Sequence, residues 1–309
     1  MRTWLVTGGC GFIGSHLVEA LLARGDQVRV LDDLSSGRRD NIASTVDLRI
    51  GDVADEKAVA DALDGVDGCF HLAAVASVQR CTEAWVASHR TNVTGTVAIL
   101  DRARRATSPP VPVVYASSAA VYGDNPETPL KETATTAPLS AYGVDKLACE
   151  WHARVGWAVH RVPSVGLRFF NVYGPRQDPS SPYSGVIAIF ADRLATGRDV
   201  DIFGDGRQTR DFIYVADVVA HLIAAMSAAA AGARVYNVCT GRGVSLLELL
   251  EVLKGLTGTS PVVHHRAPRA GDIRTSIGDP SAATAALGTA ARTTMTDGLR
   301  ATLDTSDRK

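Results

Sequence analysis

The chain has 309 residues, enough for one large domain with a smaller lobe or for two average domains. Lys and Arg number 32 and Asp and Glu 33, and the resulting net charge of −1 gives no electrostatic basis for binding nucleic acid or an anionic membrane. Hydrophobic residues make up 46% of the chain and aromatic residues only 6%, so an aliphatic core, typical of layered α/β folds, is expected.

Cysteine usage and hydropathy bear on where the protein works. The five cysteines include no CxxC pair and are odd in number, which argues against a disulfide framework and favours a reducing compartment. The apolar segment at the N-terminus is too short for a signal peptide, and no apolar stretch reaches membrane-spanning length. We therefore expect a cytoplasmic location, with neither a membrane nor a nucleic acid as partner.

Short apolar segments alternate with longer amphipathic segments through the first half of the chain. Strands are expected at residues 3–7, 27–32, 46–50, 67–72 and 111–116, and helices at 12–24, 55–64 and 82–106. This alternation is typical of a parallel sheet with helices on both faces. The sequence therefore predicts an α/β fold with a doubly wound parallel sheet.

The pattern changes after Phe170. Proline and glycine recur through residues 175–206, as in a loop-rich region, before a strand–helix pattern returns. Helical patches separated by turns fill the tail. We expect a dinucleotide-binding domain of residues 1–170 that also receives 212–240, and a smaller C-terminal α/β substrate lobe made of 171–211 and 241–309.

Three glycines follow the first predicted strand and open the first predicted helix. Gly8, Gly11 and Gly14 are spaced three residues apart. Glycines at this spacing permit a tight turn, close approach of the backbone to a pyrophosphate, and tight packing of the helix on the strand. The helix start would then face the phosphates with unpaired N–H groups. This context predicts a Rossmann-type dinucleotide site, the alternative being an ordinary strand–turn–helix corner.

An acidic residue, Asp32, ends the second predicted strand. An acid at this place hydrogen-bonds the adenosine ribose hydroxyls and repels a 2′-phosphate, which favours NAD over NADP. Arg38 and Arg39 follow closely and leave NADP open as an alternative.

Tyr142 and Lys146 are four residues apart, so on a helix they share one face. A phenol has an ordinary pKa of about 10 and is a poor base near neutral pH unless that pKa is lowered. A neighbouring ammonium and a positive nicotinamide ring both favour the phenolate. A solvent-exposed surface pair is the alternative interpretation.

Ser117 and Ser118 end a predicted buried strand. Parallel strands present their C-terminal edge to ligands, so a hydroxyl there can hold a substrate alcohol. A serine that caps the next turn is the alternative.

Taken together, these elements resemble the extended short-chain dehydrogenase/reductase family, and within it the UDP-glucose 4-epimerases and their UDP-N-acetylglucosamine-acting relatives. The resemblance covers nearly the whole chain. The matching stretches are Thr7–Gly14, His71–Ala74, Asn92–Thr96, Ser117–Gly123, Tyr142–Lys146, Arg168–Pro175, Gly204–Asp211 and Arg269–Asp272.

The resemblance implies NAD as cofactor and a UDP-sugar as substrate. It also implies a catalytic set in which Tyr142 is the base and Ser118 hydrogen-bonds the reacting sugar hydroxyl. Lys146 would hold the nicotinamide ribose and lower the pKa of Tyr142. It assigns to the cofactor Gly8, Gly11, Phe12, Ile13, Gly14, Asp32, Asp33, Ser36, Gly37, Asp52, Val53, Leu72, Ala73, Ala74, Asn92, Ser117, Tyr142, Lys146 and Phe169. It assigns to the substrate Ser118, Asn171, Val186, Phe203, Arg210, Arg269, Asp272 and Ser276. For the arginines, surface salt bridges are the alternative.

Three positions differ from those of related enzymes with other activities or substrates, and these differences indicate which reaction and which sugars to expect. Ala119 and Ala120 stand where related dehydratases carry an acidic pair, which disfavours elimination of water. Asn171 stands where enzymes acting on UDP-glucuronate often have threonine. Ser276 is small where a bulky tyrosine restricts related pockets to plain hexoses. We therefore predict a 4-epimerase acting on UDP-GlcNAc/UDP-GalNAc, on UDP-Glc/UDP-Gal, or on both pairs.

Other functions remain open at this point: another nucleotide-sugar oxidoreductase of the family, such as a 4-ketosugar reductase, dehydratase or uronate enzyme, or, as the remotest alternative, a non-catalytic NAD-binding protein. No metal site is predicted, because the adjacent His264 and His265 lack HExxH spacing and a nearby carboxylate cluster and are better explained by a surface strand. The family likeness also suggests a homodimer formed through a helix bundle.

Overall fold

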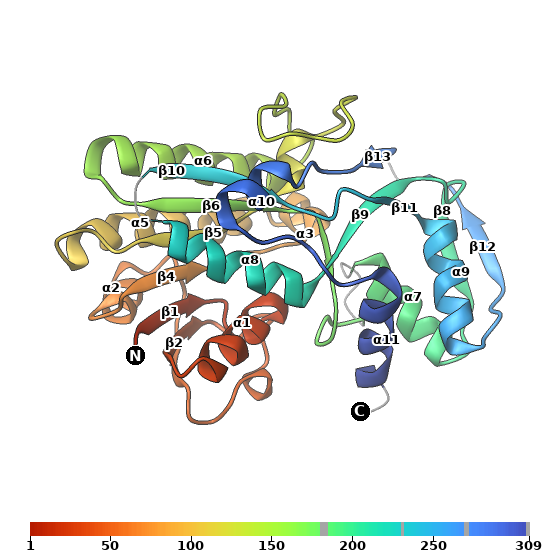
Figure 1. The fold of residues 1–309 in the computed structure, drawn as a ribbon, viewed down its shortest axis with the longest axis horizontal. Helices are drawn as coiled ribbons and strands as arrows, with labels where there is room; N and C mark the ends of the chain where they lie inside the picture. The colour runs from red at the N-terminus through yellow and green to blue at the C-terminus, as the bar shows by residue number, and fades with distance from the viewer. Residues whose placement is uncertain (180–184, 230–231, 269–271, 307–309) are drawn as a thin grey trace.

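The computed structural model describes residues 1–179, 185–229, 232–268 and 272–306, and is built around one seven-stranded parallel sheet (Figure 1). The strand order is β10-β6-β5-β4-β1-β2-β3. The bounds are β1 (Thr3–Thr7), β2 (Gln27–Asp32), β3 (Asp47–Ile50), β4 (Gly68–His71), β5 (Val113–Ser118), β6 (Ser164–Phe169) and β10 (Ala233–Val238). The predicted doubly wound α/β fold is confirmed, and the five predicted strands match β1 to β5 within about two residues at each end.

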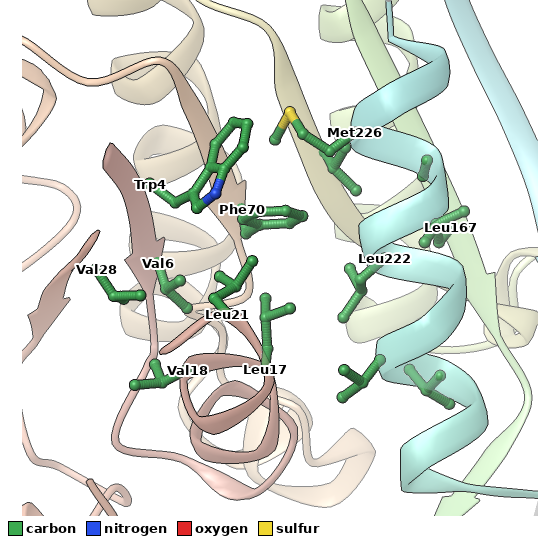
Figure 2. Packing of buried hydrophobic residues seen from close by; sticks show 14 of the residues in the cluster. Trp4, Val6, Leu17, Val18, Leu21, Val28, Phe70, Leu167, Leu222 and Met226 are labelled. Atoms are coloured by element: carbon green, nitrogen blue, oxygen red, sulfur yellow. The ribbon is translucent and has the colours of Figure 1, made fainter. Parts of the chain in front are cut away.

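Helices cover both faces of this sheet. On one face lie α1 (Phe12–Ala23) and α8 (Val215–Ala228), and on the other lie α2 (Glu56–Leu63), α5 (Gly95–Ala106) and α6 (Ala141–His160). Because successive side chains of a strand point to opposite faces, Trp4 and Val6 join the first apolar cluster while Leu5 joins the second. Figure 2 shows Trp4 and Phe70 of the sheet packed between Leu21 of α1 and Met226 of α8.

The helix predicted at 82–106 is interrupted, which corrects the sequence-based prediction. Its region contains α3 (Val78–Glu83), α4 (Trp85–His89), a π-helical segment (Arg90–Thr94) and then α5. Ala84 leaves the helical conformation with φ −120° and ψ 52° and separates α3 from α4. The apolar periodicity runs through both breaks, and for this reason the sequence did not reveal them.

The second group of elements forms a smaller assembly beside the main sheet. Strand β9 (Thr209–Tyr214) pairs with β7 (Asn171–Tyr173), β11 (Gly243–Ser245) and β13 (Thr275–Ser276), while β8 (Val200–Phe203) pairs with β12 (Val263–Arg266). Helices α7 (Val186–Ala195), α9 (Leu246–Thr257) and α11 (Met295–Ser306) enclose a separate apolar cluster with these strands. Helix α10 (Ser281–Leu287) contacts α8 and β10.

Short 3-10 turns at Arg39–Asn41 and Ala119–Tyr122 follow β2 and β5. Among the described residues, no helix combines the length and the apolar character needed to cross a bilayer.

Candidate functional site

The glycine loop between β1 and α1 forms a close-packed turn at the C-terminal edge of the main sheet. Gly8 has a φ of +68°, and a Cβ there would lie 2.7 Å from the backbone nitrogen of Ala73. A Cβ on Gly14 would overlap the carbonyl oxygen of Gly8, and one on Gly11 would lie 3.2 Å from that oxygen. A side chain at any of the three would therefore fill the turn or push α1 away from the sheet.

Helix α1 begins directly after this turn with Gly11 as its N-cap. No side chain in the described part of the chain caps it, so the first N–H groups, at Phe12, Ile13 and Gly14, have no side-chain acceptor. Such groups, together with the helix dipole, form an anion site. The side-chain-free turn and the uncapped helix start fit the pyrophosphate of a dinucleotide.

Asp32, at the end of β2, joins the glycine loop to the loop that follows. Its Oδ2 accepts a hydrogen bond from the Cys10 nitrogen and its Oδ1 from the Leu34 nitrogen, both at 2.9 Å. Burial raises the pKa of Asp32, and the two hydrogen bonds partly offset that effect. Gly37 lies close, since a Cβ there would be 3.0 Å from Asp32 Oδ1. Each carboxylate oxygen keeps accepting capacity for ribose hydroxyls.

Two other predicted cofactor residues, Asp33 and Ser36, are exposed in this same loop. Asp33 Oδ1 accepts from the Ser35 nitrogen at 2.9 Å and from Ser35 Oγ at 2.6 Å. These bonds shape the loop beside Asp32, which is where a ribose held by Asp32 would lie.

Asp52 and Val53 follow β3, where the adenine was predicted. Asp52 accepts hydrogen bonds from the Ala54 nitrogen, at 2.8 Å, and from the Arg90 guanidinium. Burial alone would raise the pKa of Asp52, but these two donors prevail and lower it. Val53 is buried, and a Cβ on Gly95 would lie 2.8 Å from its side chain. The Arg90 contact ties this loop to the π-helical segment, and sequence reasoning missed it.

Leu72, Ala73 and Ala74 follow β4 directly. The Leu72 nitrogen donates to the Thr7 carbonyl at 3.1 Å, and the Ala73 nitrogen donates to Thr7 Oγ1 at 3.2 Å. These bonds hold the end of β4 against the end of β1, with Ala73 against Gly8.

His71, the last residue of β4, is a buried structural residue to which the sequence assigned no role. Its Nδ1 lies 2.8 Å from Thr7 Oγ1 and its Nε2 lies 3.0 Å from Thr96 Oγ1. Burial, with a smaller contribution from the charge of Lys146, lowers the pKa of His71 to about 3. The imidazole is therefore neutral at physiological pH and serves as a hydrogen-bonded link between β1, β4 and α5.

Asn92 lies in the π-helical segment and is buried. Its Oδ1 accepts from the Val75 nitrogen at 2.8 Å, and its Nδ2 donates to Asp145 Oδ2 at 3.4 Å. His89 Nδ1 lies 2.8 Å from the other oxygen of Asp145. π-Helical turns such as this one occur frequently at functional sites.

Tyr142 and Lys146 lie on α6, which Ser140 caps by accepting from the Gly143 nitrogen at 3.1 Å. Lys146 is buried, and its Nζ donates to the Ala116 carbonyl at 2.9 Å. That Nζ lies 5.8 Å from the centre of the Tyr142 ring. One donor of the ammonium is used in this way, which leaves two for a ligand.

Ser118 ends β5 and caps the following 3-10 turn by accepting from the Ala120 nitrogen at 3.2 Å. The capping role does not use the hydroxyl hydrogen, so Ser118 can still donate to a substrate oxygen. Ser117, by contrast, is buried and donates to Glu150 Oε1 at 2.5 Å. Ser118 pairs in register with Phe169 of β6, which brings two predicted site residues side by side.

The predicted substrate residues belong mostly to the smaller assembly. Arg210 on β9 donates from Nη2 to Asp272 Oδ1 at 2.5 Å, and burial lowers the pKa of Arg210 against this attraction. Ser276 on β13 pairs in register with Arg210. Gln208, which the sequence analysis did not single out, donates from Nε2 to Asp272 Oδ2 at 3.3 Å and to the Phe203 carbonyl at 2.8 Å.

The remaining predictions lie around this group. Asn171 is exposed at the start of β7, which pairs with β9, and it follows Phe169 by two residues. Val186 opens α7 and packs against the cluster of the smaller assembly. Arg269 lies outside the described residues. The chain passes directly from β6, which pairs with β5 in the main sheet, to β7, which pairs with β9 of the smaller assembly.

Comparison with known proteins gives a consistent result. Residues 4–239 match the model of the NAD dependent epimerase/dehydratase family. A UDP-glucose 4-epimerase of Mycolicibacterium smegmatis is 38% identical over 310 residues, covering 98% of each chain. A dTDP-glucose 4,6-dehydratase of Streptomyces niveus is 33% identical and covers 97% of this chain and 91% of its own.

Two solved structures share the fold over nearly their whole length. The UDP-glucose 4-epimerase of Thermus thermophilus in complex with NAD has a TM-score of 0.90 and 37% identity, with 98% of each chain covered. The UDP-N-acetylglucosamine 4-epimerase of Methanobrevibacter ruminantium M1 in complex with UDP-N-acetylmuramic acid has a TM-score of 0.94 and 32% identity, covering 99% of this chain and 98% of its own. The predicted cofactor, NAD, is thereby confirmed, and the chain belongs to the NAD dependent epimerase/dehydratase family of extended short-chain dehydrogenases/reductases.

Proposed function

We propose that the protein inverts C4 of a UDP-sugar, acting on UDP-GlcNAc/UDP-GalNAc, on UDP-Glc/UDP-Gal, or on both pairs. The observation that carries this proposal is the arrangement of the end of β5 and the start of α6. Lys146 bonds the carbonyl of Ala116, two residues before Ser118, and its ammonium lies 5.8 Å from the centre of the Tyr142 ring. The end of β5 and the first turns of α6 thus carry the hydroxyl, the phenol and the ammonium that the reaction requires.

Each residue has a distinct part in this proposal. NAD, when bound, would supply the acceptor and donor of the C4 hydride. Tyr142 takes the proton of the 4-hydroxyl and later gives it back, while Ser118 donates a hydrogen bond to the same oxygen. The positive charge of Lys146 favours the phenolate, and its two remaining N–H groups suit ribose hydroxyls.

The nucleotide must stay bound while the 4-keto sugar turns to present its other face. Arg210 and the predicted Arg269 are suited to the diphosphate, because a near-neutral protein binds that group through concentrated fork-shaped donors. Asp272 holds Arg210 in place at 2.5 Å, and we assign Asn171, Val186 and Phe203 to the same nucleotide. Firm contacts to the nucleotide and loose contacts to the sugar would allow the keto sugar to rotate.

We assign cofactor binding to residues 1–170 with 212–240 and substrate binding to the lobe made of 171–211 and 241–309.

The sugar is tested most directly by incubating the purified protein with UDP-GlcNAc, UDP-Glc and UDP-GlcA without added cofactor and following C4 stereochemistry by NMR. The proposal predicts a 4-epimer from at least one of the first two sugars. A 4-keto-6-deoxy product would instead indicate a dehydratase, and a requirement for stoichiometric NAD(P)H would indicate a ketosugar reductase.

Ser276 is the residue that we expect to admit the N-acetyl group. It is half-buried on β13 beside Arg210. Ser276→Tyr should abolish measurable activity on UDP-GlcNAc while activity on UDP-Glc persists, because a bulky ring would occupy the space of the acetyl group. Full activity of this variant on UDP-GlcNAc would exclude the assignment.

We also propose a homodimer formed through α6 and its neighbours. Trp151, Val155 and Val159 recur at four-residue spacing on α6 and are 55%, 53% and 65% exposed. Such an apolar stripe on a surface helix is typical of a helix–helix interface. Analytical ultracentrifugation should find a dimer that Val155→Glu converts to a monomer, and a monomeric parent protein would refute the proposal.

A further inference from the structure

A second set of buried contacts, outside the glycine turn between β1 and α1, ties α6 to β5. Ser117 Oγ donates to Glu150 Oε1 at 2.5 Å, and Lys146 Nζ donates to the preceding residue, Ala116, at 2.9 Å. Tyr142, Lys146 and Glu150 follow one another at four-residue spacing, so they share one face of α6. Consecutive residues of β5 are therefore bonded to consecutive turns of the helix that carries Tyr142.

Glu150 is in turn held by a buried arginine of the adjacent strand. Arg168 Nε donates to Glu150 Oε1 at 2.9 Å and Arg168 Nη2 donates to Oε2 at 2.7 Å, a bidentate pair with side chains 7% and 6% exposed. A buried pair of this geometry contributes little net stability, but it fixes orientation because each partner makes several buried hydrogen bonds.

From Arg168 the network continues to β10. Arg168 Nη1 donates to Tyr122 Oη at 2.8 Å, and that hydroxyl donates to Asn237 Oδ1 at 2.7 Å. Asn237 Nδ2 then donates to the Leu130 carbonyl at 2.9 Å. Tyr122 and Asn237 are both fully buried, so water does not compete for these bonds.

Leu130 in its turn holds the backbone just beyond Ser276. The Leu130 nitrogen donates to the Ile277 carbonyl at 2.8 Å, and the Asp279 nitrogen donates to the Leu130 carbonyl at 2.8 Å. Leu130 and Gly278 form an isolated parallel bridge. An unbroken chain of buried contacts therefore runs from the strand that ends in Ser118 to the segment that carries Ser276.

We propose that Glu150 and Arg168 are positioning residues that set both ends of the sugar site at once, the catalytic end through Ser117 and α6 and the sugar-discriminating end through Tyr122, Asn237 and Leu130. The proposal rests on the function proposed above. It implies that sugar preference depends on Tyr122, a residue buried away from the surface of the site. The second arm of the network, from Arg168 to Asn237, has two links. Besides the Tyr122 hydroxyl, Arg168 Nη1 donates to the Glu132 carbonyl at 3.1 Å, and Glu132 Oε1 accepts from the Asn237 nitrogen at 2.7 Å. Tyr122→Phe therefore removes one link of the second arm and leaves the first arm, through Ser117, intact.

Amide hydrogen exchange of the purified protein, with its bound NAD, tests the proposal without reference to any substrate. Tyr122→Phe keeps the ring and removes the hydroxyl, so exchange should rise at residues 276–279 and stay unchanged at 116–119. Glu150→Gln should raise exchange at both segments. Ser164→Ala is the matched control, because Ser164 is a buried β6 residue whose hydroxyl has no partner among the described residues.

Kinetics of the same variants separate positioning from mere stability. Glu150→Gln should lower kcat about tenfold or more on every accepted sugar with KM nearly unchanged, as expected when reacting groups are misplaced. Tyr122→Phe should leave kcat on the preferred sugar within about twofold and change the ratio of kcat/KM between UDP-GlcNAc and UDP-Glc about threefold or more.

Unchanged exchange at 276–279 in Tyr122→Phe would overturn the proposal, and so would a lower Tm accompanied by an unchanged sugar ratio. If Glu150→Gln fails to fold, Tyr122→Phe still gives a decision. If the parent protein inverts neither sugar, the proposed function is wrong, and the exchange measurement alone decides whether the network positions the two segments.

Discussion

Two parts of the candidate site differ in how they are built. The cofactor edge comprises the glycine turn, the start of α1 and Lys146, and the substrate edge comprises Arg210 and Ser276 with Asp272. At the cofactor edge the shape comes from the backbone: glycines in a closed turn, an uncapped helix start and a buried lysine bonded to a carbonyl. At the substrate edge the shape comes from side-chain contacts between distant segments, such as that of Arg210 with Asp272. The first edge therefore depends on backbone geometry that single side chains cannot restore, whereas the second depends on individual side-chain pairs.

Removing the phenol at the cofactor edge should have the largest effect on activity. Tyr142→Phe leaves the ring and takes away the proton acceptor, so turnover should fall about 10²- to 10⁴-fold while bound NAD is retained. Single-turnover and steady-state rates measure the change. Tyr236→Phe, on β10, is the control and should keep full activity; a Tyr142→Phe variant that did the same would remove Tyr142 from the chemistry.

Filling the glycine turn should abolish cofactor binding. In Gly14→Ala the new Cβ would overlap the Gly8 carbonyl, which is backbone and cannot move aside, so destabilisation of about 3 kcal/mol and loss of co-purified NAD are expected. Gly255→Ala is the matched control on α9, where a Cβ meets nothing within 4 Å and the change should stabilise the helix slightly. Thermal unfolding and the NAD content of both variants give the answer, and NAD retained at the parental level in Gly14→Ala would contradict the account of this edge.

The substrate edge should respond through affinity, with the cofactor unaffected. Arg210→Met removes the guanidinium and leaves Asp272 without its ion-pair partner, so the Kd for UDP should rise about tenfold or more while NAD content stays constant. Calorimetric titration with UDP measures this. Arg274→Met, which breaks an exposed pair with Asp205, should not change the Kd. An equal loss in both variants would show that general charge, and not the position of Arg210, attracts the nucleotide.

Acid should weaken the cofactor edge through His71. Its folded pKa, about 3, lies below the value of 6.5 expected in the unfolded chain, so between these values the unfolded state binds a proton that the folded state does not. Stability conferred by the neutral imidazole is therefore complete above pH 6.5 and declines as the pH falls, by at most about 1.4 kcal/mol per pH unit.

Urea unfolding of the parent and of His71→Gln between about pH 7 and pH 5 tests this expectation. The slope of stability against pH should be shallower in the variant by up to one proton, while the difference between the two proteins should be constant above about pH 7.5. Parallel slopes below pH 6.5 would contradict the assignment of a buried neutral histidine.

The cofactor edge was readable from the sequence because its determinants are local. The spacing of Gly8, Gly11 and Gly14 and the position of Asp32 after a strand are properties of one short segment, and strand boundaries follow from apolar runs. The four-residue spacing of Tyr142 and Lys146 and the place of Ser118 at the end of a strand are also local features, and the family resemblance added the specific role predicted for each residue.

What the sequence missed depends on contacts between distant segments. Nothing in the spacing of Arg90 indicates that it reaches Asp52, and nothing near Glu150 indicates Arg168 on another strand. The π-helical segment at Asn92 has the same apolar periodicity as a regular helix, so the change of register was invisible. Buried polar networks form only after the fold has brought the segments together.

The most direct test of the central claim is the fate of a deuterium placed at C4 of the UDP-sugar, followed by NMR with no added NAD. If a retained cofactor takes the hydride and returns it to the opposite face, the product will be inverted at C4 and will still carry the label there. An uninverted sugar, or an inverted sugar whose label has passed to water, would contradict the account.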